Sequence, residues 1–109
     1  MPNQKVETLF AALADPTRLA VVERLGQGPA SVSELAGAFP IALPSFLQHL
    51  KLLESAGLVS SAKAGRVRTC TLEPLALAAV ERWIVERRRE TEARYGRLAA
   101  YLDSQEPLA

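Results

Sequence analysis

Residues 43–59 combine uncharged polar, basic and apolar side chains at the spacing of a helix. Phe46 and Leu50 fall on one apolar stripe that can face a core, whereas Ser45, Gln48 and Lys51 fall off it. A glutamine can bond both polar atoms of an adenine edge, a serine can bond a base or a phosphate, and a lysine suits phosphate. A short helix with an apolar back and this front favours contact with the major groove of DNA.

Three apolar residues, Leu43, Pro44 and Leu47, fall near the start of the same helix and are expected on its exposed side. Thymine methyl groups would suit them; a protein partner and a plain solvated face are the alternatives. His49 is the only histidine, and no cysteine, histidine or acidic cluster near it would complete a metal site. We therefore expect His49 to be structural or to contact phosphate.

A basic hairpin is expected after this helix. Two runs rich in Val and Thr, about residues 58–62 and 67–72, flank a turn that contains a glycine. The hairpin carries three cations and no acidic residue, which favours the DNA backbone or minor groove, although charge also protects a sheet edge from aggregation. The predicted DNA-binding set is therefore Leu43, Pro44, Ser45, Leu47, Gln48, His49, Lys51, Lys63, Arg66 and Arg68.

The composition narrows the class of protein. The chain has 109 residues, 49% hydrophobic residues and a net charge of +1, so one folded domain is expected and any DNA affinity must come from a local patch. No apolar run approaches the ~20 residues of a membrane span, and no signal peptide is evident. The single cysteine, Cys70, is expected to be an inert thiol in a reducing cytoplasm. Neither a phosphate-binding loop nor a catalytic nucleophile motif is present, so we expect no enzyme and no cofactor.

The elements that must position these residues follow from caps and periodicity. Asp15-Pro16 starts one helix with Leu19, Val22 and Leu25 inward, and Ser31 with Glu34 forms a capping box for the next. Helices are expected at about residues 4–14, 16–25, 31–39, 43–56 and 74–104. The predicted fold, a single domain over residues 1–109, is mainly α with a small β-hairpin. It is a winged helix-turn-helix with extra N- and C-terminal dimerisation helices.

The last helix, about residues 74–104, is long for so small a domain and is expected to pair with the first helix across a homodimer. Packing on its own domain is the alternative. A small apolar effector held near Trp83 and Tyr95 is a further possibility. The predicted interface set is Val6, Leu9, Phe10, Leu13, Ile84, Thr91, Tyr95, Leu98 and Leu102.

Four segments together resemble the ArsR-type winged-helix repressors. They are Leu13-Ala-Asp-Pro-Thr-Arg-Leu19, Ser33-Glu-Leu35, Phe46-Leu-Gln-His-Leu-Lys-Leu-Leu-Glu-Ser-Ala-Gly-Leu-Val59 and Gly65-Arg66. The resemblance implies a homodimer, built through the first and last helices, that binds double-stranded DNA at a palindromic operator, represses transcription, and is released by an effector.

The sequence departs from the metal-sensing members of that family. Those members carry Cys-x-Cys at the start of the third helix, where this chain has Ser31 and Ser33, and others use histidines on a last helix that has none here. Because neutral hydroxyls are poor ligands for soft metals, the resemblance implies the metal-independent branch. The recognition helix begins Ala42-Leu-Pro-Ser45 where relatives have more hydroxyl side chains, so more methyl contact is expected in the operator.

Overall fold

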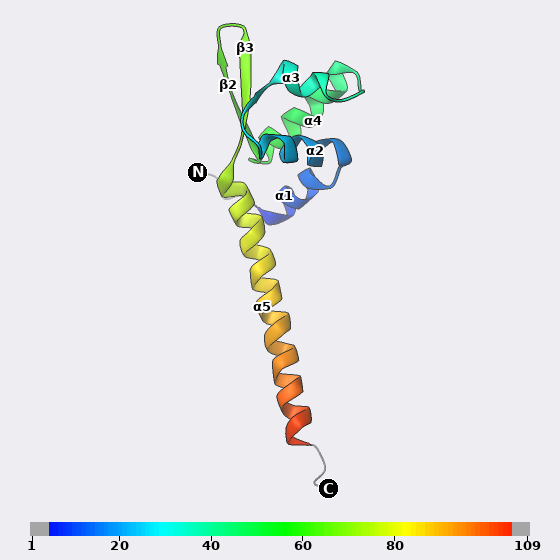
Figure 1. Cartoon of the computed structure of the whole chain (residues 1–109), viewed down its shortest axis with the longest axis vertical. Coiled ribbons are helices and arrows are strands. Elements are labelled where there is room, and N and C mark those ends of the chain that lie inside the picture. The colour runs from blue at the N-terminus through cyan, green and yellow to red at the C-terminus, as the bar shows by residue number, and fades with distance from the viewer. Residues whose placement is uncertain (1–4, 106–109) are drawn as a thin grey trace.

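The computed structural model describes residues 5–105, and within them a helical body carries a small sheet and one long projecting helix (Figure 1). The elements in chain order are α1 (Val6–Leu13), α2 (Pro16–Leu25), β1 (Ala30–Ser31), α3 (Val32–Gly37), α4 (Leu43–Ser55), β2 (Val59–Ala64), β3 (Val67–Leu72) and α5 (Pro74–Ser104). The predicted mainly α fold with a winged helix-turn-helix is confirmed. None of the described helices combines the length and apolar character of a membrane span.

Local chemistry starts the helices where the sequence predicted. The Asp15 carboxylate accepts a hydrogen bond from the Arg18 backbone N–H at 3.0 Å, and Pro16 occupies the first turn of α2. The Ser31 hydroxyl accepts from the Glu34 N–H while the Glu34 carboxylate accepts from the Ser31 N–H, both at 3.1 Å. These bonds satisfy N–H groups that a helix leaves without partners in its first turn.

The sheet has a third strand that the sequence analysis missed. β1 pairs antiparallel with β3, opposite Cys70 and Thr69, so the strand order is β1-β3-β2. A two-residue strand is too short to show an alternating pattern, which explains the omission. β2 also runs to Ala64, past the predicted end of the strand, and the turn contracts to Gly65 and Arg66. Gly65 takes a φ of +63°, a conformation that favours glycine.

The core lies between α1, α2, the back of α4 and the root of the sheet. Phe46, Leu50 and Leu53 are buried, as their helical spacing predicts. The prediction that Leu19 faces the core is wrong, because Leu19 is 44% exposed whereas Val21 is fully buried. The inward stripe of α2 is Val21, Val22 and Leu25, and the i, i+3, i+4, i+7 spacing of that stripe begins at position 18, which holds an arginine.

α5 leaves this body as a single helix (Figure 1). Its start is held by α1, where the Phe10 and Trp83 rings meet edge to face with centroids 5.4 Å apart. Every residue from Arg88 to Gln105 is exposed. The molecule consequently measures 77 Å along its longest axis and only 32 and 21 Å along the others. Helices in proteins gain most of their stability from packing, and among the described residues no other element covers the second half of α5.

Candidate nucleic-acid interface

Three polar side chains of α4 that were predicted to contact DNA lie on its exposed face. Because α4 turns its buried stripe toward α2 and the sheet, Ser45, Gln48 and Lys51 lie on the outside of the body. α3 and the short turn over residues 38–42 precede α4 and give the helix-turn-helix its shape. The backs of α3 and α4 are anchored by Leu35 and by the stacked rings of Phe39 and Phe46, 5.6 Å apart.

An apolar group surrounds the start of α4. Leu43 is 54% exposed, and Pro44 and Leu47 are also exposed, as expected. Ile41, in the turn just before the helix, is exposed as well and was missed by the sequence analysis, although an apolar residue in a surface turn was a usable signal. Val67 is also exposed and was also missed, but it belongs to the wing, where it begins β3 next to the hairpin turn. Exposed apolar side chains gathered around a helix start favour a partner surface.

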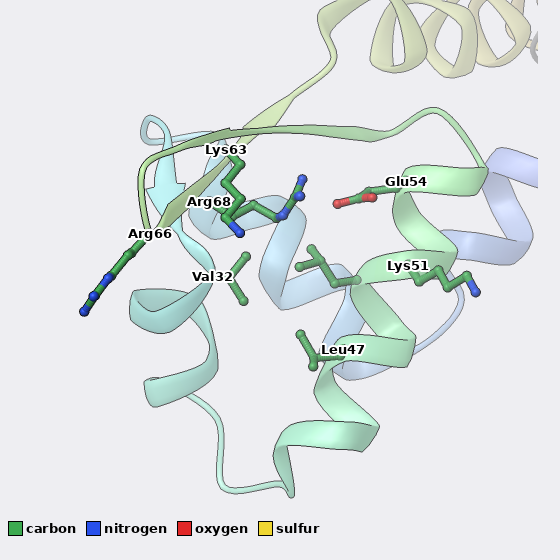
Figure 2. A pocket seen from close by; sticks show the side chains of 8 residues that line it. Val32, Leu47, Lys51, Glu54, Lys63, Arg66 and Arg68 are labelled. Atoms are coloured by element: carbon green, nitrogen blue, oxygen red, sulfur yellow. The ribbon is translucent and has the colours of Figure 1, made fainter.

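An open cleft of about 390 Å³ lies between α4 and the β2–β3 hairpin, and Figure 2 shows the side chains around it. Lys63 and Arg68 lie close together on the hairpin, Arg66 points outward from its tip, and Lys51 points away on the other side of α4 (Figure 2). The cleft brings together residues from α3, α4, β2, β3 and the hairpin turn. Its lining is Val32, Leu47, Leu50, Lys51, Glu54, Lys63, Arg66 and Arg68.

Two cations in this cleft face each other across the hairpin. Lys63 and Arg68 are direct partners in the β2–β3 register, and Arg68 also donates a hydrogen bond to the Ser61 hydroxyl at 3.0 Å. Like charges placed directly opposite each other destabilise a strand pair, and an anion between them reverses that effect. The pair therefore suits a phosphate group of a nucleic-acid backbone.

His49 lies apart from the other predicted contacts, on the α2 side of α4. Its Nδ1 is 3.1 Å from Nη1 of Arg18 and 3.7 Å from the Asp15 carboxylate, and the side chain is half-buried. Nδ1 therefore has partners inside the fold, which favours the structural role expected for His49, and the phosphate contact of this residue stays a prediction. Asp15 stays anionic because the Arg18 backbone N–H lowers the pKa of its carboxyl.

The predicted interface residues divide between the core and the surface. Leu9 is 0% exposed within this protomer, so it has no surface to offer a second copy, and its assignment to the interface is wrong. Val6, Phe10 and Leu13 are half-buried. The α5 residues form an exposed stripe, with Tyr95 at 65% and Ile84, Thr91, Leu98 and Leu102 also exposed. The stripe includes a shallow hollow of about 370 Å³ beside Trp83 and Tyr95, the place considered for an effector.

The side chains of Ser31 and Cys70 are engaged in a hydrogen bond and buried, respectively. Ser31, which replaces the first cysteine of metal-sensing relatives, uses its hydroxyl to cap α3. Burial raises the pKa of the Cys70 thiol, which is the opposite of thiol activation. Within residues 5–105, no three histidine, cysteine or acidic side chains gather in a metal-ligand arrangement.

Sequence comparisons relate this chain to known helix-turn-helix regulators. A family profile described as "Helix-turn-helix domain" matches residues 13–62. The HTH-type transcriptional regulator Rv2034 of Mycobacterium tuberculosis is 51% identical over 71 residues, 65% of this chain and 66% of that protein. The transcriptional repressor SmtB of the same organism is 41% identical over 58 residues, 53% of this chain and 43% of SmtB. The chain therefore matches two thirds or less of the length of these relatives.

Solved structures agree with the sequence matches over more of the chain. A crystal structure of an ArsR family transcriptional regulator superposes with a TM-score of 0.77 at 50% identity, covering 80% of this chain and 96% of the other. An ArsR-like regulator from Rhodococcus sp. RHA1 superposes with a TM-score of 0.76 at 31% identity, covering 94% of each chain. These relatives are transcriptional regulators and not enzymes. On these matches, the chain belongs to the ArsR family of winged helix-turn-helix transcriptional regulators.

Proposed function

We propose that the protein is a homodimeric repressor that binds an inverted-repeat operator through α4 and the β2–β3 wing, without sensing a metal. The observation that carries this proposal is the cleft in which the exposed side of α4 meets three wing cations. In a chain with a net charge of only +1, that concentration of positive charge is local and lies beside the helix that can read bases.

Base recognition would fall to the front of α4. Gln48 is exposed and has the donor and acceptor that an adenine edge requires, and Ser45 lies one turn earlier. Leu43 and Leu47 present methyl groups that suit thymine. Lys51 on α4 and the three wing cations would bind phosphates, which orient the helix without reading sequence.

Dimerisation would use the exposed stripe on α5. Tyr95, Leu98 and Leu102 recur at spacings of three and four residues on a helix whose described residues from Arg88 onward are all exposed. A two-fold dimer presents two copies of α4 to successive major grooves, about 34–36 Å apart. The operator is then an inverted repeat, and the regulator acts in the cytoplasm where the DNA is.

Metal independence is supported by the chemistry of the third helix. The Ser31 hydroxyl caps α3, and Ser33 offers only a neutral hydroxyl oxygen. Soft metals prefer thiolate ligands. We expect operator affinity to be unchanged by chelator or by added zinc.

DNase footprinting across a promoter library, combined with light scattering of the free protein, tests the proposal. We expect a dimer in solution and protection of two inverted half-sites one helical turn apart. Protection of a single asymmetric site by a monomer would overturn the dimeric model. Absence of salt-dependent DNA binding would instead favour a protein partner for Leu43, Pro44 and Leu47.

A further inference from the structure

Arg18 occupies a position in α2 where an apolar side chain is expected. It stands one turn before Val21 and Val22 on the inward stripe and is half-buried. A charged group at such a position is unfavourable unless hydrogen bonds compensate for its lost hydration, so the guanidinium requires partners inside the fold. Two of them are carbonyls in the last turn of α1: Nε donates to Ala12 at 2.6 Å and Nη2 to Ala11 at 3.3 Å. Both carbonyls lie in the last turn of α1, and that of Ala11 also accepts the Ala14 backbone N–H at 3.2 Å. Arg18 therefore ties α2 to the end of α1.

The third partner of the guanidinium lies on the recognition helix. Nη1 of Arg18 is 3.1 Å from Nδ1 of His49, a contact that spans 31 residues of sequence. A guanidinium has only donors and stays charged, so Nδ1 must be the acceptor and carry no proton. The imidazole proton then lies on Nε2. The Asp15 carboxylate competes weakly for Nδ1, because it is 3.7 Å away and already accepts the Arg18 backbone N–H.

We propose that Arg18 is a positioning residue for DNA recognition: its bond to Nδ1 holds His49 in the Nε2–H tautomer and fixes α4 to the C-terminal end of α1. This inference rests on the proposed function, since it assigns a role in operator reading. His49 adjoins Gln48 and follows Ser45 by one turn, so a rotation of α4 that released His49 would also displace both base-reading side chains. Base contacts require that placement, whereas phosphate contacts tolerate more movement. Loss of the Arg18–His49 bond is therefore expected to weaken specific binding much more than non-specific binding.

The tautomer can be measured without DNA. His49 is the only histidine, so protein labelled with ¹⁵N-histidine gives a single imidazole signal set. For the neutral ring, we expect a pyridine-type Nδ1 and a pyrrole-type Nε2. Arg18→Lys cannot span the same acceptors and should release the ring to a mixture of tautomers. Arg24→Lys is the matched control, because Arg24 lies on the same helix and its guanidinium bonds the Gly28 carbonyl at 3.1 Å instead of a group on α4. A pyrrole-type Nδ1 in the wild type, donating to Asp15, would overturn the proposal.

The role in recognition is tested with the operator found by footprinting and a scrambled duplex of equal length. His49→Leu removes the acceptor, and we expect about tenfold weaker operator binding with less than about a twofold change on the scrambled duplex. His49→Asn keeps an oxygen acceptor near the position of Nδ1 and should restore most of the operator affinity. Arg18→Lys should resemble His49→Leu, and the double variant should lose little more than either single one, because both remove the same bond.

Thermal unfolding by circular dichroism checks that each variant is folded at the assay temperature. Equal losses of affinity on both duplexes, or full operator affinity in His49→Leu, would show that the bond does not position α4. If the wild type fails to distinguish any operator from the scrambled duplex, the proposed function fails, while the tautomer measurement still tests the Arg18–His49 bond.

Discussion

Single side chains at the helix starts carry charges that stabilise this fold. Hydrogen bonds with Ser31, first with its backbone N–H and then with its side chain, lower the pKa of the Glu34 carboxyl. A hydrogen bond from the Arg18 backbone N–H lowers the pKa of the Asp15 carboxyl. A carboxyl whose pKa is lower in the folded state adds stability above its unfolded pKa and loses that stability as the pH falls through the folded value. Both groups therefore favour the folded state at neutral pH and not in acid.

Glu34→Gln separates the charge from the capping geometry. Glutamine can keep the reciprocal bonds with Ser31 but does not titrate. We expect the free energy of unfolding of the wild type to fall more steeply than that of Glu34→Gln once the pH drops below about 4.3. Urea unfolding between pH 7 and pH 3 measures this difference. Glu23→Gln on the exposed side of α2 is the control, and a pH profile in Glu34→Gln identical to the wild type would contradict the prediction.

Gln48 is the residue on which base choice is expected to depend. Gln48→Ala should cost about 1–3 kcal/mol of operator binding and relax the preference at one base pair in each half-site. Competition binding with operators substituted at each position measures both effects. Gln27→Ala, an exposed glutamine in the loop after α2, should change neither. Unchanged affinity and base preference in Gln48→Ala would show that Gln48 does not contact a base.

At the scale of helices and strands, the sequence predicted the features that depend on interactions between residues near one another in the chain. The capping residues Asp15 and Ser31 and the buried side of α4 follow from short-range bonds and from a 3.6-residue period, so they could be predicted. The pairing of β1 with β3 and the orientation of α2 could not, because both depend on contacts between distant segments. Nor could the partners of Arg18 be predicted, because it bonds carbonyls of α1 and His49, which only the packed helices bring together.

The wing is the element expected to supply affinity without sequence preference. Arg66→Ala at the hairpin turn should weaken binding to operator and scrambled DNA alike and reduce the slope of log affinity against log salt by about 1. Titrations at several salt concentrations measure the slope. Arg89→Ala on α5 is the control, because Arg89 is exposed and lies away from the cleft. A loss confined to the operator would show that Arg66 reads bases.

At the scale of the whole molecule, the exposed stripe of α5 is expected to join two copies. Leu98→Glu places a charge in that stripe without disturbing the protomer, because the side chain is exposed and contacts no other element. We expect the mass measured by light scattering to fall to that of a monomer and operator binding to be lost. Ala100→Glu, on the opposite side of α5, should leave both unchanged. A Leu98→Glu variant that remains a dimer would place the interface elsewhere.

The joint between the wing and α5 has a consequence for the evolution of this regulator. A single residue, Glu73, separates β3 from α5, and its backbone N–H donates to the Leu58 carbonyl at 2.8 Å. In a dimer held by α5, the angle at this joint sets how far apart the two copies of α4 stand. Substitutions at Glu73-Pro74 would then change the tolerated distance between half-sites and leave the preferred bases alone. In such a dimer, the spacing and the base sequence of the operator would depend on separate parts of the chain and would evolve independently.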